Sequence, residues 1–254
     1  MIHIHEHRYL YLEEINEGIL RNIPECDSTG EKEVLDVGCG SGTLSEAIQS
    51  KGYTVWGIEA DEEAAAGAAK RIKRVINADL TSMPDIEAQL AENVFDYIVF
   101  SDVLEHIYDP FLTVKQYLPF LKSGGHLLIS VPNAVVWTNR LRVLFGRFDY
   151  CDTGVLDRTH IRFFTFNSAK ALVSAAGCSI ETTDYTPFFT RALLPVIKKL
   201  FLKGGAPEGT GRRQLIDSPS YKLYMKYMYP AEYLLGKLSM PLFAFRIIIV
   251  GRKS

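Results

Sequence analysis

The sequence lacks several features that mark common protein classes. No uninterrupted apolar stretch reaches the about 20 residues that cross a bilayer, and no internal repeat or low-complexity tract is present. Its four cysteines are scattered without a CxxC pair, which disfavours a disulfide framework and a zinc-binding motif. The first residues, MIHIHEHRYL, lack the apolar core of a secretory signal. We therefore expect a cytoplasmic protein.

The composition is that of a globular protein, with 47% hydrophobic and 23% charged residues. The net charge of −2 conceals an asymmetry, because twelve Lys and Arg but only three acidic residues lie at 191–254. In LLPVIKKLFLKGG the lysines fall opposite an apolar helical face. This pattern predicts peripheral contact with an anionic membrane at its inner face. A lid packed on the core is the alternative interpretation.

Strand and helix signals alternate along most of the chain. Strand patterns occupy 33–37, 54–59, 75–78, 95–100, 126–131, 178–185 and 243–250, and helix patterns occupy 8–20, 43–50, 61–74, 109–121 and 167–176. This alternation predicts a parallel sheet with helices on both faces. Residues 134–166, rich in loops and aromatics, and residues 187–240 depart from the alternation. Both follow late strands, so we expect them at the sheet edge where such folds bind ligands.

The segment VLDVGCGSG at 34–42 is the strongest local signal. An apolar strand leads directly into glycines at every second position, and a helix pattern begins at Thr43. Glycines let a backbone approach a ligand closely, although a tight turn alone would also explain them. Asp36 stands two residues before the first glycine, where it would repel a pyrophosphate and attract an ammonium group.

Two further acids follow the neighbouring strands. Glu59 ends the second strand, where a carboxylate can accept both hydroxyls of a ribose. Asp79 follows the third strand and can accept a hydrogen bond from an adenine amino group. A ligand with an ammonium group, a ribose and an adenine but no phosphate is S-adenosylmethionine (SAM).

These features together resemble the class I SAM-dependent methyltransferases. VLDVGCGSG is similar to the first motif of that family, VWGIEAD to the second, NADL to the third, FDYIVFSDVLEHI to the fourth and LKSGGHLLISVPN to the next. The resemblance implies an α/β, Rossmann-like, doubly wound sheet of seven strands in the order 3-2-1-4-5-7-6, with the last strand antiparallel. We expect one domain, with a helical cap at 1–30, a core at 31–186 and 241–254, and a helical insertion at 187–240 over the acceptor site.

The resemblance assigns nine residues to the cofactor. They are Asp36, Gly38, Cys39, Gly40, Gly42, Glu59, Asp79, Leu80 and Ser101. Cys39 is expected to be a small packing residue and not a nucleophile. For Glu59 the alternative is a solvated strand-end acid, and for Asp79 it is a helix N-cap.

Two histidines are candidates for acid–base chemistry at the acceptor. His106 follows the fourth strand, and His160 lies in GVLDRTHIRFFT, a segment rich in polar groups. Either can take the proton of a hydroxyl acceptor, or can order its loop through a hydrogen bond. Asp157, Arg158 and Arg162 can line an acceptor pocket or form a salt-bridged hairpin. No metal is predicted, because the alternating histidines of MIHIHEHRYL are better explained as the start of a helix.

We therefore predict SAM-dependent O-methylation. GVLDRTHIRFFT resembles a segment of methyltransferases associated with glycan and lipopolysaccharide assembly, so a sugar or lipid-linked glycan is the expected acceptor. Quinone-biosynthesis or other small-molecule O-methylation is the first alternative, because the LEH motif resembles that family too. A SAM-binding regulator or scaffold without catalysis is the second. Nucleic acid is not an expected partner, because no NPPY-like motif follows the fourth strand.

Overall fold

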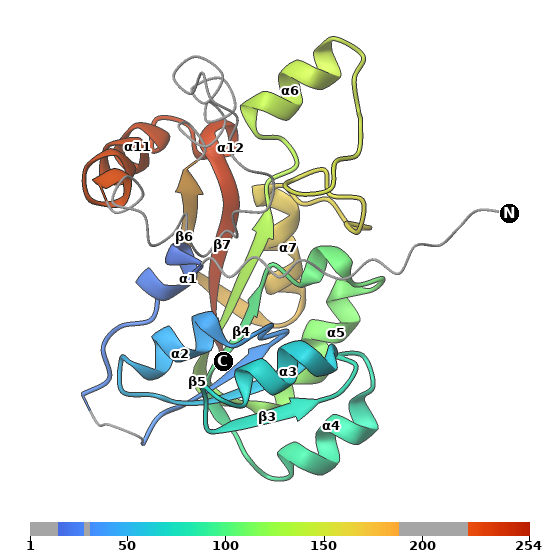
Figure 1. Cartoon of the computed structure of the whole chain (residues 1–254), viewed down its shortest axis with the longest axis vertical. Helices are drawn as coiled ribbons and strands as arrows, with labels where there is room; N and C mark the ends of the chain where they lie inside the picture. The colour runs from blue at the N-terminus through green and yellow to red at the C-terminus, as the bar shows by residue number, and fades with distance from the viewer. Residues whose placement is uncertain (1–14, 28–30, 188–222) are drawn as a thin grey trace, which may run out of the picture.

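The computed structural model describes residues 15–27, 31–187 and 223–254 (Figure 1). Most of the helix predicted at 8–20 lies outside these residues, as do the three N-terminal histidines. Within them, α1 (Glu17–Arg21) is a short helix whose N-cap, Asn16, accepts a hydrogen bond from the backbone of Ile19.

The described strands form one seven-stranded sheet in the order β3-β2-β1-β4-β5-β7-β6. They are β1 (Glu33–Val37), β2 (Thr54–Glu59), β3 (Arg74–Asn77), β4 (Phe95–Ser101), β5 (Leu121–Pro132), β6 (Cys178–Pro187) and β7 (Ala244–Lys253). Strand β7 runs antiparallel to both of its neighbours, whereas the pairs from β3 to β5 are parallel. The predicted fold class, strand order and antiparallel last strand are confirmed.

The helices follow the strands as expected, with several corrections. They are α2 (Thr43–Gln49), α3 (Glu62–Ala68), α4 (Met83–Leu90), α5 (Pro110–Tyr117), α6 (Trp137–Leu144), α7 (Phe166–Ala175), α11 (Tyr229–Gly236) and α12 (Met240–Phe243). Two 3₁₀ helices, η1 (Leu104–His106) and η2 (Leu118–Phe120), and one π-helix, η3 (Tyr224–Met228), accompany them. The helix predicted at 61–74 is too long, because α3 ends at Ala68 and the chain turns so that Ile72 is buried. Helices α4 and α6 were not predicted.

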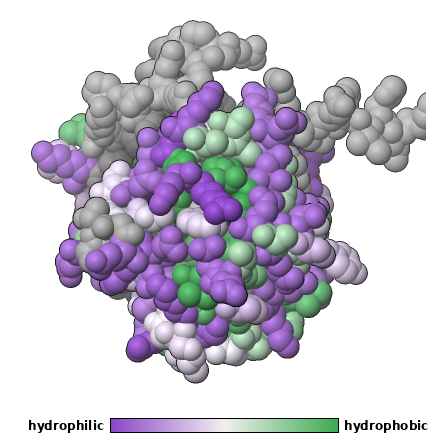
Figure 2. All heavy atoms as spheres, turned by 90° about the horizontal axis from the view of Figure 1, so that it is seen from below, coloured by the Kyte–Doolittle hydropathy of each residue, from purple (hydrophilic) through white to green (hydrophobic). Residues whose placement is uncertain are grey.

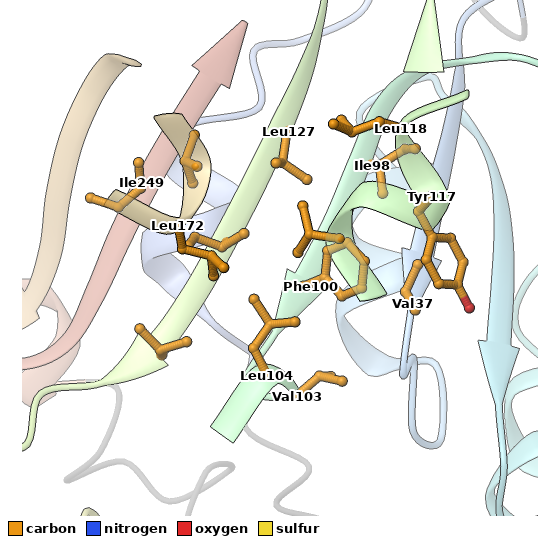
Figure 3. Close-up of a cluster of buried hydrophobic side chains, with 14 of the residues drawn as sticks. Val37, Ile98, Phe100, Val103, Leu104, Tyr117, Leu118, Leu127, Leu172 and Ile249 are labelled. Atoms are coloured by element: carbon orange, nitrogen blue, oxygen red, sulfur yellow. The ribbon is translucent and has the colours of Figure 1, made fainter. Parts of the chain in front are cut away.

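The core divides into two clusters on opposite faces of the sheet because successive strand residues point to opposite sides. One cluster packs side chains of α4, α5 and α7 against Val37 of β1 and Phe100 of β4. Figure 3 shows Tyr117 of α5 and Leu172 of α7 in this cluster. The other packs α1 and α2 against Val34 and Val99 of the same two strands. The layers therefore run helix, sheet, helix.

Seen from below, most of the described surface is hydrophilic (Figure 2).

The carboxyl end of the parallel strands is where the irregular segments gather. Helix α6 follows β5, and α11 and α12 precede β7, so that all three lie at the end toward which β5 and β6 point (Figure 1). Helix α11 packs on β6 through the stacked rings of Tyr185 and Tyr233, whose centroids are 5.0 Å apart. The insertion predicted at 187–240 lies largely outside the described residues, so its role as a cover stays a prediction.

Among the residues that the structure describes, no helix combines the length and apolar character that spanning a membrane requires.

Gly57 and Gly67 lie next to the loop at residues 38–42, and they offer a matched test of how tightly the chain packs there. A Cβ atom at Gly57 of β2 would lie 2.6 Å from Sγ of Cys39 and 2.9 Å from Cδ1 of Ile72. Gly57→Ala should therefore lower the free energy of unfolding by about 1–3 kcal/mol. A Cβ at Gly67 of α3 meets its nearest neighbour at 3.6 Å, so Gly67→Ala should be neutral or stabilise by up to about 1 kcal/mol. Urea unfolding of both variants measures this, and equal effects would contradict the packing described.

Candidate active site

The glycine loop folds over the end of β2. Gly38, Gly40 and Gly42 have φ angles of 77°, 54° and 82°, the left-handed region that favours glycine. The N–H groups of Gly38 and Cys39 donate to the carbonyl of Ile58, at 2.8 and 3.0 Å. A Cβ at Gly38 would lie 2.5 Å from Cγ2 of Val103, so this glycine also permits the close approach of the segment after β4.

Asp36 lies buried beneath this loop. Its Oδ2 accepts a 2.5 Å hydrogen bond from Ser45, the third residue of α2. Its Oδ1 has no hydrogen-bond partner among the described residues. Burial raises the pKa of Asp36 to about 6, an increase that the Ser45 bond opposes and the charge of Glu59 reinforces. An unpartnered, buried carboxylate oxygen fits a cationic ligand group such as an ammonium.

Glu59 connects two loops at the sheet edge. Its side chain is buried, and its Oε2 accepts from the N–H of Gly40 at 2.8 Å while Oε1 accepts from the N–H of Asp61 at 2.9 Å. The alternative of a solvated strand-end acid is therefore wrong. A carboxylate has about four acceptor positions, and the predicted contact with a ribose stays a prediction.

Leu80 and Asp79 lie on the other side of the glycine loop. The carbonyl of Leu80 accepts a 2.9 Å bond from the hydroxyl of Tyr117, and its Cδ1 lies 3.5 Å from a Cβ built at Gly38. Oδ1 of Asp79 accepts two bonds of 2.8 Å from Thr81. The N-cap of α4 is Ser82, so the alternative N-cap role of Asp79 is not realised. Its predicted contact with adenine is untested.

Cys39 behaves as the packing residue that was expected. Its side chain is buried, and its Sγ faces Gly57 of β2. Burial raises the pKa of the Cys39 thiol, and the nearby charges of Asp36 and Glu59 raise it further. A protonated, buried thiol is a poor nucleophile.

A polar network that the sequence did not reveal begins at the end of β4. Asn16 donates to the hydroxyls of Ser101 and Ser130, at 3.0 and 2.8 Å. Ser130 donates to Oδ1 of Asp102, and Nε of Arg246 donates to its Oδ2 at 2.6 Å. Asp102 has a φ of 56°, unusual for a residue other than glycine. Its position directly after a strand was the only signal available in the sequence.

The structure brings His106 and His160 together and adds Glu105 to them. The two imidazole centroids are 4.8 Å apart. Nδ1 of His106 lies 3.2 Å from the carbonyl of Thr159, and Nδ1 of His160 lies 3.1 Å from that of Val155. Nε2 of His160 faces Oε1 of Glu105 at 4.0 Å. The sequence did contain a signal for Glu105 as a site residue, because it stands directly before His106 in the LEH motif.

Burial dominates the electrostatics of this group. Glu105 is 1% exposed, and its Oε2 has no hydrogen-bond partner among the described residues. Burial raises the pKa of Glu105 well above its usual range, and the charge of Asp102 adds to this. Burial and the proximity of His160 lower the pKa of His106, so His106 is neutral at neutral pH.

The loop that carries His160 is held by bonds of its own. Asp157 accepts hydrogen bonds from the backbone and the hydroxyl of Thr159. Arg158 donates to Asp152, and Arg162 donates to the carbonyl of Tyr108, just after η1. The N–H groups of Ile161 and Arg162 donate to the carbonyl of Glu105 at 2.9 and 3.0 Å. These contacts favour the structural alternative for Asp157, Arg158 and Arg162.

Asp36 generates a pH dependence that can be measured. Its pKa is about 4 in an unfolded chain and about 6 in the folded protein. Because the folded value is higher, its contribution to stability is full below pH 4 and is lost as the pH rises through 6. Asp36→Asn does not titrate, so its free energy of unfolding relative to the wild type should rise by about 2 kcal/mol between pH 4 and 7.

Urea unfolding at several pH values tests this expectation. Asp85→Asn, which removes an exposed carboxyl of α4, is the control for the loss of one charge. A difference between Asp36→Asn and wild type that stays constant with pH would contradict a buried, titrating Asp36.

Comparison with known proteins identifies the family to which the chain belongs. A family model described as "Methyltransferase domain" matches residues 4–183. The ubiquinone biosynthesis O-methyltransferase of Pseudomonas putida (strain GB-1) is 35% identical over 132 residues, which cover 50% of this chain and 56% of that protein. The enzyme of the same name from Vibrio parahaemolyticus is 31% identical over 113 residues, covering 44% and 48%. The chain thus spans about half the length of these relatives.

Solved structures agree on the fold. A SAM-dependent methyltransferase from Archaeoglobus fulgidus superposes with a TM-score of 0.55 at 17% identity, covering 92% of this chain and 90% of that one. The magnesium protoporphyrin IX methyltransferase of Synechocystis, solved with bound SAH, gives a TM-score of 0.52 at 14% identity, covering 92% and 77%. The chain therefore belongs to the methyltransferase domain family, and the predicted membership of the class I SAM-dependent methyltransferases is confirmed.

Proposed function

We propose that this protein transfers the methyl group of SAM to a hydroxyl oxygen of a quinone-type aromatic acceptor. The observation that carries this proposal is the contact between Gly38 and Val103. It joins the glycine loop, expected to hold the cofactor, to the segment that leads within three residues to His106. Cofactor side and acceptor side thus meet at one edge of the sheet.

The cofactor side has the chemistry that SAM requires. Asp36 offers an unpartnered buried oxygen to an ammonium group, and Glu59 is held by two backbone N–H groups at the adjacent strand end. SAM supplies a methyl group on a sulfonium, whose transfer depends on alignment more than on acid–base help. The rigid, hydrogen-bonded glycine loop suits that requirement.

The acceptor side favours an aromatic ring. Phe148, Tyr150 and Phe163 are exposed, and the ring of Phe148 lies 5.9 Å from each of the other two. Tyr108, just beyond η1, is 81% exposed. Aromatic side chains offer stacking surfaces for a flat, apolar ring. The ubiquinone biosynthesis relatives support the same choice.

A sugar or lipid-linked glycan is the second candidate acceptor. The segment that resembles glycan-associated methyltransferases is the loop that carries His160, and its backbone is bonded to Glu105. That contact gives the loop a fixed place beside the histidines, which supports a role for it in acceptor selection.

Peripheral membrane contact also belongs to the proposal. Leu234, Leu235 and Leu238, in and just after α11, are 64%, 55% and 81% exposed. Lys226 precedes them in the sequence, and Lys237 lies between Leu235 and Leu238. Exposed apolar side chains with adjacent cations support binding to an anionic lipid surface, and the binding should weaken as salt rises.

The role of Glu59 can be measured by calorimetry with SAM. Glu59→Ala should weaken binding by about 10- to 150-fold, equivalent to about 1.5–3 kcal/mol, because a charged hydrogen-bond acceptor is lost. Glu62→Ala, an exposed acid in the first turn of α3, is the control and should bind as the wild type does. Thermal unfolding checks that both variants fold, and an unchanged affinity of Glu59→Ala would place the ribose elsewhere.

The acceptor is tested by transfer of label from methyl-labelled SAM. We expect label in hydroxylated quinone precursors supplied as acceptors, and His106→Ala should lower turnover by about 100-fold while SAM affinity is kept. Label found only in a polysaccharide or glycolipid fraction of cell extract would favour the second candidate. Binding of SAM without transfer to any fraction would contradict an enzyme and favour a regulator or scaffold.

A further inference from the structure

We infer that Glu105, His106 and His160 form a binding site for a divalent transition-metal cation beside the methyl-transfer site. Each residue offers one ligand atom, and these atoms all lie within 4.8 Å of one another. Two imidazoles and one carboxylate are a donor set that suits zinc and its first-row neighbours. The sequence predicted no metal and pointed to acid–base chemistry for both histidines, which are 54 residues apart.

The imidazoles are oriented as metal-binding histidines usually are. Nδ1 of each ring lies within 3.2 Å of a backbone carbonyl, that of Thr159 for His106 and that of Val155 for His160. A carbonyl can only accept, so Nδ1 of each ring carries the proton and Nε2 is the nitrogen suited to bind a metal. Histidine ligands of metals are generally fixed in this way by a partner on the second nitrogen.

Glu105 supplies the second, independent observation. Its carboxyl group is buried, and Oε2 has no partner among the described residues. Leaving a carboxylate oxygen unpaired in a protein interior is costly, and a bound cation would remove that cost. The neighbouring cation Arg246 donates through Nε to Asp102, and no described residue, Arg246 included, donates a hydrogen bond to Oε2 of Glu105.

Modest side-chain rotations would complete the site. Zinc binds nitrogen and oxygen ligands at about 2.0–2.2 Å, so its ligands lie about 3 Å apart. Nε2 of His160 and Oε1 of Glu105 are 4.0 Å apart, and both residues are on segments joined by the two N–H bonds to the carbonyl of Glu105. Three protein ligands leave coordination positions open for an acceptor oxygen.

The role of the cation rests on the proposed function, whereas its binding does not. A hydroxyl oxygen bound to the cation loses its proton to water more readily, because the cation stabilises the oxyanion. The oxygen then forms its bond to the methyl carbon as the bond from that carbon to sulfur breaks. The two histidines would hold the cation in this arrangement and would not themselves take the proton.

Zinc titration by calorimetry, with metal content measured after dialysis, tests the site. The titration uses the full chain with His3, His5 and His7 replaced by alanine, so that these histidines do not contribute. We expect one zinc per chain. Adding His160→Ala or Glu105→Gln should weaken binding by about 100-fold or more.

A matched control is available on the sheet surface. His126 and Glu181 form another histidine–glutamate pair, at 3.0 Å and partly exposed. His126→Ala should therefore leave zinc binding unchanged. Circular dichroism checks that each variant folds, and Glu105→Gln keeps the shape of the side chain if His160→Ala does not fold.

The outcomes separate the inference from the proposed function. If the chain without His3, His5 and His7 does not bind zinc, or if its His160→Ala and Glu105→Gln variants bind zinc as tightly as it does, the site is overturned even if methyl transfer is observed. Turnover that is the same in metal-free and zinc-loaded enzyme overturns the role of the cation in activating the acceptor. Zinc binding without methyl transfer to any acceptor overturns the proposed function and leaves the cation site standing.

Discussion

The buried carboxylate of Glu59 is the constraint on which the glycine loop of this protein depends. Through Gly40 and Asp61 it fixes the glycine loop and the start of α3 to the end of β2. A buried charge is tolerated only when it is well hydrogen-bonded, so the two loops and the acid stabilise one another. The loop held in this way covers Asp36 and leaves room at Gly38 for Val103, which aligns η1 with the site.

Much of the fold could be predicted because its signals are local. Strand β2 has the predicted bounds because Thr54, Val55 and Ile58 favour a strand, and because the turn at Gly52 precedes it and the N-cap Asp61 of α3 follows it. Strand β5 is longer than predicted because the glycines at 124–125 suggest a turn, whereas the strand continues through them with a shifted register against β4. Helix α4 was missed although Met83, Ile86 and Leu90 have helical spacing, because Pro84 suggests a break when it in fact occupies the first turn.

In the candidate site, too, the local features could be predicted and the long-range contacts could not. The glycine loop and the strand-end acids belong to short contiguous motifs, so they could be predicted from the sequence. The network of Asp102 with Arg246 and the group of Glu105 with His160 were not predictable as pairs, because the partners are far apart in sequence. The separation is 144 residues between Asp102 and Arg246. Such contacts depend on how the antiparallel β7 and the loop before α7 return to the edge of the sheet.

In the proposed function, cofactor and acceptor bind on either side of the close approach of Val103 to Gly38. A crystal structure of the protein with S-adenosylhomocysteine tests this claim most directly. We expect the ribose hydroxyls within hydrogen-bond distance of Glu59 and the sulfur on the side of His106 and His160. A sulfur turned away from the two histidines, or a ligand bound away from the glycine loop, would contradict it.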